Sequence, residues 1–134
     1  MKMREYPVEI WMAFAETFGE KDQFHQWLMT NGYPELGALS SAIRGSEEAL
    51  EWLMKHQFFH FAALDGAIDN QAGARNWLKT HGFDILLHLA DSVNMRAESI
   101  QWLENQQLEL FLLIALRIRT YRDQQTFDYH KKSF

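Results

Sequence analysis

The segment ARNWLKTHGFDILLHLADSV, residues 74–93, is one of four copies of a repeat that decides the fold of this chain. Residues 24–43, 49–68 and 99–118 align with it without gaps, because each copy begins 25 residues after the one before. The copies share a Trp-Leu pair: Trp27-Leu28, Trp52-Leu53, Trp77-Leu78 and Trp102-Leu103. A fixed period of this length is typical of proteins that stack one structural unit many times.

The apolar residues of each copy follow the spacing of two short α-helices. Leu86, Leu89 and Val93 lie three and four residues apart, as on one face of a helix. The Trp-Leu pair forms a second stripe of this kind with the residue three positions before the Trp. Gly82, between the stripes, suits the left-handed residue that often ends a helix. The repeat therefore predicts an all-α fold, an α-solenoid of about five stacked helix-turn-helix pairs in one domain, residues 1–134.

Helices of two or three turns are barely stable alone, so each pair depends on its neighbours in the stack. The central pairs are covered on both sides, and we predict that Trp52 and Trp77 are largely buried. Trp11 belongs to a first half-repeat, residues 8–18, where one side of the stack meets solvent. Replacing Trp52 or Trp77 with Ala is predicted to cost about 3–5 kcal/mol, more than at Trp11.

The last copy of the repeat ends differently from the others. Phe127 takes the place of the Trp, and we predict a capping helix at about residues 120–131, with a frayed tail as the alternative. Leu112 and Leu116, in the preceding helix, replace residues that are mostly small or polar in the other copies. An apolar helix surface must be covered. We expect the capping helix to cover these two leucines; otherwise they form the interface of a homodimer joined at the C-terminal end.

One copy of the repeat resembles a known family. Leu87-His88-Leu89-Ala90, followed by a helix with Trp102-Leu103, looks like the "L-H-L-A … L-L" signature of ankyrin repeats. The period is shorter than the ankyrin period, and the missing length is where the β-hairpin would lie. The chain thus resembles an ankyrin-like helical repeat protein lacking the β-hairpins, and a HEAT-like stack of helix pairs is the alternative. The resemblance implies protein binding through a concave surface, without catalysis.

Composition favours a globular, cytoplasmic protein. Hydrophobic residues make up 47% and charged residues 23% of the chain, unlike a disordered protein. The absence of Cys excludes disulfides and thiolate metal sites. The charged N-terminus does not resemble a secretory signal, and the longest apolar run, residues 110–116, is too short to cross a bilayer. The net charge of -5 argues against a nucleic acid partner.

The residues capable of catalysis or metal binding have simpler structural explanations. His56 and His60 have the i, i+4 spacing of paired metal ligands, but the predicted turn separates them. His56 and His81 hold equivalent positions in two copies, about 8–10 Å apart, which is too far for one metal ion. The acids of segment 47–51 lie in a first helical turn, where negative charge is favourable. We predict no metal, no cofactor and no enzymatic activity; a helical-repeat enzyme that uses the histidines is the alternative.

The remaining candidates lie on the second helix of each central pair. Asp65, Asp69, Asp91 and Asn94 are predicted to lie near one concave surface beside small residues, and we expect them to bind a partner. The body of the chain is acidic, so a basic partner would be attracted electrostatically. The predicted function is a non-enzymatic protein–protein interaction module, such as an acidic inhibitor or immunity-type adaptor. A structural homo-oligomer is the alternative, and no membrane partner is expected.

Overall fold

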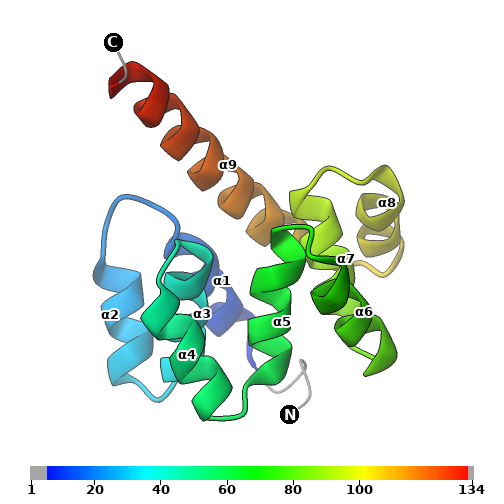
Figure 1. The fold of residues 1–134 in the computed structure, drawn as a ribbon, viewed down its shortest axis with the longest axis horizontal. Coiled ribbons are helices and arrows are strands. Elements are labelled where there is room, and N and C mark those ends of the chain that lie inside the picture. The colour runs from blue at the N-terminus through cyan, green and yellow to red at the C-terminus, as the bar shows by residue number, and fades with distance from the viewer. Residues whose placement is uncertain (1–5, 133–134) are drawn as a thin grey trace.

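The computed structural model describes residues 6–132, with side chains through Gln125, and in this range it contains nine helices and no strand (Figure 1). The helices are α1 (Val8–Glu16), α2 (Gln23–Thr30), α3 (Pro34–Ile43), α4 (Glu47–Lys55), α5 (Phe59–Ile68), α6 (Ala72–Thr80), α7 (Asp84–Val93), α8 (Ala97–Asn105) and α9 (Glu109–Lys132). The all-α prediction is confirmed. Within the described range, none of these helices is long and apolar enough to cross a membrane.

A left-handed residue closes both turns of the repeat. These residues are Gly32, Gln57, Gly82 and Gln107 after the even-numbered helices, and Gly45, Asn70 and Met95 after the odd-numbered ones. The next N–H donates back into the last helical turn, as from Phe83 to the Leu78 carbonyl at 2.9 Å. This arrangement satisfies carbonyls that the helix end leaves free. Because the turns are short, consecutive helices run in opposite directions.

The five odd-numbered helices form a closed ring. Each of α1, α3, α5 and α7 contacts the next odd-numbered helix, and α9 contacts α1. The even-numbered helices lie outside, where α2 contacts α1 and α3, α4 contacts α3 and α5, α6 contacts α5 and α7, and α8 contacts α7 and α9. The prediction of an open concave surface is therefore wrong. The contact between the first and last inner helices closes the curve, and side chains fill its interior.

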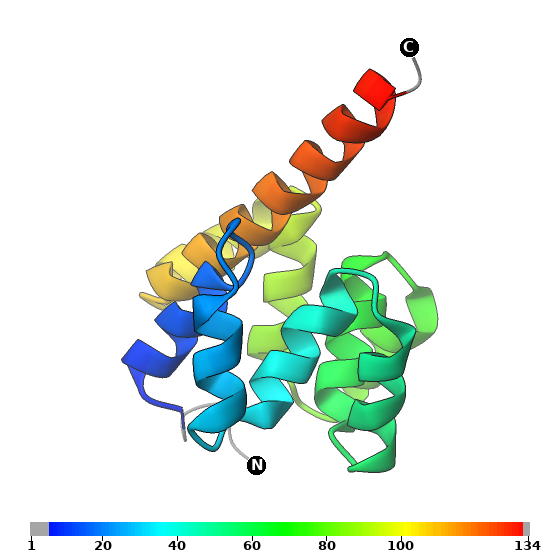
Figure 2. The ribbon, with the colours of Figure 1, turned by 90° about the vertical axis from the view of Figure 1, so that its left-hand side faces the viewer.

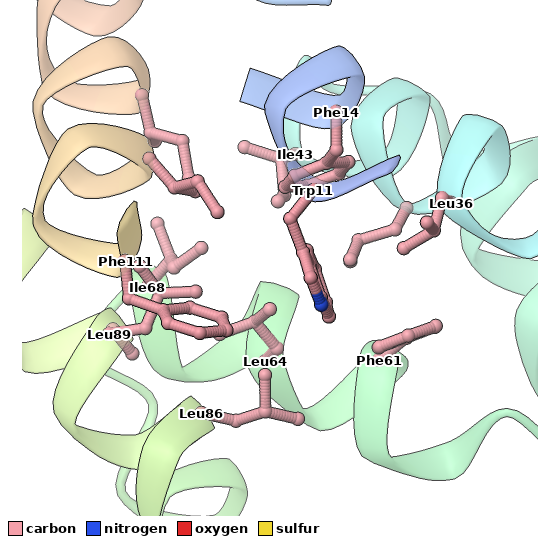
Figure 3. Packing of buried hydrophobic residues seen from close by; sticks show 14 of the residues in the cluster. Trp11, Phe14, Leu36, Ile43, Phe61, Leu64, Ile68, Leu86, Leu89 and Phe111 are labelled. Atoms are coloured by element: carbon pink, nitrogen blue, oxygen red, sulfur yellow. The ribbon is translucent and has the colours of Figure 1, made fainter. Parts of the chain in front are cut away.

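Residues from equivalent positions of the repeat meet inside the ring (Figure 3). The first layer consists of Trp11, Leu36, Phe61, Leu86 and Phe111, one from each inner helix, and all five are buried. Two further layers, three and seven residues later in each repeat, are buried as well. The Trp11 ring packs edge-on against the Phe111 ring, with 5.3 Å between centroids. This contact joins the two ends of the ring across four repeats.

In each Trp-Leu pair the Leu packs in the core and the Trp lies at the outer edge. Leu28, Leu53, Leu78 and Leu103 are fully buried, while Trp52, Trp77 and Trp102 are half-buried and Trp27 is 44% exposed. Trp11 is only 3% exposed. Trp11 is thus more deeply buried than Trp52 and Trp77, which argues against the prediction that replacing either of them costs more than replacing Trp11. Ring closure makes α1 a central helix, and the outer indoles instead lie flat against neighbouring rings.

The two helices predicted at the C-terminal end are one continuous helix, α9, which projects from the body of the protein (Figures 1 and 2). The predictions of a tenth helix and of a separate cap at residues 120–131 are therefore wrong. Earlier turns have Gly45, Asn70 or Met95 at the left-handed position, and the equivalent residue here is Thr120. A β-branched residue rarely adopts that conformation, so the helix continues.

The Trp11→Ala variant is expected to lose about 3–5 kcal/mol of unfolding free energy, because it removes a buried aromatic ring from the centre of the core. Trp27→Ala is the matched control, and its cost is expected to be less than half as large because that side chain is 44% exposed. Urea unfolding followed by circular dichroism measures both changes. Equal losses would show that the ring around Trp11 contributes no special stability.

Candidate binding site

A groove of about 830 Å³ lies at the N-terminal end of the ring, between α1, α7 and α9. Its aromatic walls are formed by Trp11, Phe83, Trp102 and Phe111. The other lining residues are Tyr6, Val8, Gly82, Asp84, Ile85, Gln106, Gln107, Leu108 and Leu110. The volume and the largely apolar lining are typical of sites that bind another molecule.

Ring stacking holds two walls of the groove in place. The Phe83 ring lies flat between the rings of Trp77 and His60, at centroid distances of 5.7 and 5.1 Å. Trp102 lies flat on His88 at 4.1 Å, and His88 Nδ1 is 2.8 Å from the Ser99 hydroxyl. The groove therefore has aromatic walls whose orientation is set before any partner arrives.

One carboxylate, that of Asp84, lines the groove, and two more acids are sequence neighbours of lining residues. Glu9 follows the lining residue Val8, and Glu109 precedes the lining residue Leu110. All three acids are exposed in the first turn of a helix, where the positive end of the helix dipole favours negative charge. None of the three forms an ion pair with a described residue. Among the described residues, the groove thus has a largely apolar lining that includes the carboxylate of Asp84 and neither Lys nor Arg.

The acids predicted to bind a partner lie near the opposite end of the ring, and Asp91 is only 5% exposed. Arg75 of α6 donates two hydrogen bonds to the Asp91 carboxylate, at 2.9 and 3.0 Å. Arg96 donates a third at 2.8 Å. The prediction that Asp91 lies on an open surface is wrong, because arginines on both sides of its helix reach and neutralise it.

Asp69 and Asn94 also have partners within the protein. Arg122 of α9 pairs with Asp69 and donates to the Ile68 carbonyl at 3.2 Å. The Asn94 amide donates to the same carbonyl at 3.0 Å. These bonds cap the C-terminal end of α5, whose free carbonyls carry partial negative charge. The two residues therefore have structural roles, and partner binding by either stays a prediction.

Asp65 is half-buried on α5. Burial raises the pKa of its carboxyl from 3.8 to about 6, the nearby Asp69 adds to the increase, and Arg122 opposes it. Such a group carries less charge near neutral pH than an exposed acid. Attraction of a basic partner by Asp65 also stays a prediction.

The histidines whose side chains are described do not converge on a common point. His56 and His81 lie flat on the Trp of their own repeat, with ring centroids 4.1 and 4.0 Å apart. His60 is buried against Phe83, and burial lowers the pKa of its imidazole to about 4. Within the described part of the chain, no three His, Cys, Asp or Glu residues come together in a way that could hold a metal ion.

The two leucines of α9 differ in exposure. Leu112 is half-buried against the core, whereas Leu116 is 47% exposed. Residues 120–131 were expected to cover both, and this is wrong because they continue α9 along its axis. The role of Leu112 and Leu116 in a dimer interface stays a prediction.

Comparison of the chain with known protein families, with curated proteins and with solved structures found no match. The groove itself must therefore indicate the function. Its location did not follow from the sequence, because Trp11 and Phe111 come from opposite ends of the chain. One feature of the sequence could have pointed to the groove. Gln106 stands at the repeat position of His56 and His81, on which Trp52 and Trp77 stack, so Trp102 stacks on His88 instead.

The Asp65→Asn variant tests the raised pKa. Above about pH 6 the Asp65 carboxylate is ionised in both native and unfolded states, and the native state bears the cost of burying the charge. Between pH 6 and 4 the native wild type binds a proton that the unfolded chain lacks. Wild-type stability is therefore expected to rise relative to the variant by about 2–3 kcal/mol as the pH falls from 7.5 to 4.

Urea unfolding of both proteins across this pH range measures the difference. Glu98→Gln, which removes an exposed carboxylate of α8, controls for the change in net charge. A constant difference between wild type and Asp65→Asn at every pH would contradict the expected titration.

Proposed function

We propose that this chain is a non-enzymatic protein–protein interaction module whose groove between α1, α7 and α9 binds a basic, amphipathic segment of a partner. The observation that carries the proposal is the combination of aromatic walls with the exposed carboxylate of Asp84, which forms no ion pair with a described residue. An apolar side chain of the partner enters the groove, and its Lys or Arg side chains lie near Asp84, Glu9 and Glu109. An apolar centre with a polar rim is the usual composition of a protein interface.

The groove favours binding over catalysis. Among the described residues, its lining contains no Ser, Thr, His or Lys, which are common nucleophiles and proton carriers in a chain without Cys. The hydroxyl of Tyr6 donates a hydrogen bond to Glu35. Asp84 lies exposed at the rim, where water screens its charge. Of the histidines whose side chains are described, His56 and His81 stack on outer tryptophans. His60 and His88 stack on the groove residues Phe83 and Trp102 but do not line the groove themselves.

The predicted acidic inhibitor or immunity-type adaptor fits within this proposal. The net charge of -5 supports a basic partner, but the acids that meet it lie at the groove rather than at Asp65, Asp69 and Asp91. Classification as an ankyrin-like α-solenoid is part of the same proposal, and the 25-residue repeat supports it. A cytoplasmic location is also part of the proposal, and the absence of Cys supports it.

Selection from a random twelve-residue peptide library displayed on phage tests the groove. The wild-type chain is expected to enrich peptides that combine an aromatic or aliphatic anchor with Lys or Arg. For a synthetic peptide with the enriched sequence, Trp102→Ala is expected to weaken binding about tenfold or more, because it removes an aromatic wall. Asp84→Lys is expected to slow association and to reduce its dependence on salt.

Two variants outside the groove serve as controls. Trp27→Ala removes a Trp of the same repeat position, and Glu98→Lys makes the same type of charge reversal on α8. Both are expected to bind the peptide as the wild type does. Enrichment without basic residues, or equal affinity for the Trp102→Ala variant in its folded state, would refute the proposal.

A further inference from the structure

Neighbouring inner helices meet at five places around the ring, and at one of them no described helix lies on the outside. The other four, between neighbouring inner helices, are covered in turn by α2, α4, α6 and α8. Among the described helices, none contacts both α9 and α1 from outside. We call the line where α1 meets α9 the α1–α9 seam. From their repeat positions and exposure we assign to it Val8, which also lines the candidate binding groove, with Met12, Leu113 and Leu116. The Glu16–Arg117 ion pair joins the two helices there. The seam breaks a pattern that the rest of the ring follows.

The seam exposes large apolar side chains. Val8, Met12 and Glu16 are spaced four residues apart and share one face of α1, and the Glu16 carboxylate lies 3.2 Å from the Arg117 guanidinium on α9. Val8 is 59% exposed, Met12 48% and Leu116 47%, and Leu113 is half-buried. Exposed apolar side chains gathered along one seam indicate a contact surface.

The chain carries a segment that belongs over this seam. Each inner helix is covered by the outer helix that follows it in the sequence, as α7 is by α8. Shifting α8 by one period gives residues 122–130, with Phe127 at the Trp position. In the structure this segment continues α9, because Thr120 stands where the turn needs a left-handed residue. The fifth outer helix is thus present but points away from the seam (Figure 2).

Bonds to the ring hold the segment in this direction. Arg119 donates to the Ser92 carbonyl at 2.9 Å, and Arg122 donates to the Ile68 carbonyl at 3.2 Å. Both carbonyls lie at the C-terminal ends of inner helices, where a positive charge is favourable. To fold back over its own seam, the chain would have to unwind residues 119–121 and lose these bonds. Its own C-terminal segment therefore does not cover the seam.

We propose that a second copy of this chain covers the seam with its residues 122–132 and receives the same cover in return. Outer helices run antiparallel to inner ones, so the two α9 helices lie antiparallel, related by a two-fold axis near residues 118–119. Residues 119–132 extend for about 20 Å, which exceeds the roughly 14 Å length of α1. The bodies of the two copies then lie at opposite ends of the paired helices. Reciprocal exchange of an identical element is a low-cost route to a dimer.

The repeat predicts which residues meet in this dimer. In the groove beneath α8, His88 Nδ1 lies 2.8 Å from the Ser99 hydroxyl. One period later these positions are Leu113 and Gln124. Leu113 of one copy therefore faces Gln124 of the other. Within one straight helix the two are about 16 Å apart along the axis, which is too far for a disulfide.

Cysteine pairs give a direct test, because the chain has no native Cys. Light scattering is expected to give a solution mass twice the 15.8 kDa of the chain. Leu113→Cys chains mixed with size-tagged Gln124→Cys chains are expected to form a disulfide between the two kinds of chain, and neither alone should cross-link. The variant with both substitutions is expected to run as a covalent dimer on a non-reducing gel.

Variants of the seam separate this dimer from the peptide groove. Met12→Glu and Leu116→Glu are expected to give folded monomers, whereas Met54→Glu, at a similarly exposed position on α4, is expected to stay dimeric. The groove variant Trp102→Ala is expected to keep the dimer mass, so loss of peptide binding and loss of the dimer are distinguishable. A monomeric wild type would refute the exchange. A disulfide formed within one chain of the double variant would refute it too, since that chain must have folded back on itself.

Discussion

The structure depends on the contact between α1 and α9, in which the rings of Trp11 and Phe111 lie 5.3 Å apart. Helices of two or three turns have little stability alone and must bury their apolar faces against neighbours. An open stack would leave one face of its first and last inner helices in water. Closure removes both exposed faces at once. It also converts what would be a concave binding surface into the main hydrophobic core, so interactions must take place on the outside or at the ends of the ring.

The two ends of the ring differ in whether their charged groups have partners within the protein. Inner helices are separated by one antiparallel partner and so run in the same direction, which gathers their N-termini at one end and their C-termini at the other. At the C-terminal end, Arg119 and Arg122 neutralise free carbonyls, and Arg75 and Arg96 neutralise Asp91. At the N-terminal end, the first-turn acids Glu9, Asp84 and Glu109 form no ion pair with a described residue. The N-terminal end of the ring, where these carboxylates lie, also has the aromatic groove.

The candidate site could be predicted from the sequence only in part. Position in the repeat indicated that Phe83 and Trp102 are structurally important, and both line the groove. Asp91 was predicted to be exposed because its position in the repeat does not show which side chains meet it. Arg75 comes from α6, and Arg96, five residues after Asp91, directly precedes α8; both reach the carboxylate only after the helices have packed. The sequence shows that a residue is acidic. Whether its carboxylate is free to bind a partner depends on side chains from other elements.

The sequence by itself determined the helices, their order and the inward face of each, because these follow from local spacing and from turns of a few residues. The same local logic accounts for the uninterrupted α9, where Thr120 occupies the left-handed position. Tertiary structure alone decided that the ring closes, that Trp11 is buried and that the α1–α9 seam stays open. Closure depends on a small rotation between successive repeats that accumulates until residues 100 positions apart meet. No local sequence pattern specifies the total rotation, because it arises from the packing of every helix pair between α1 and α9.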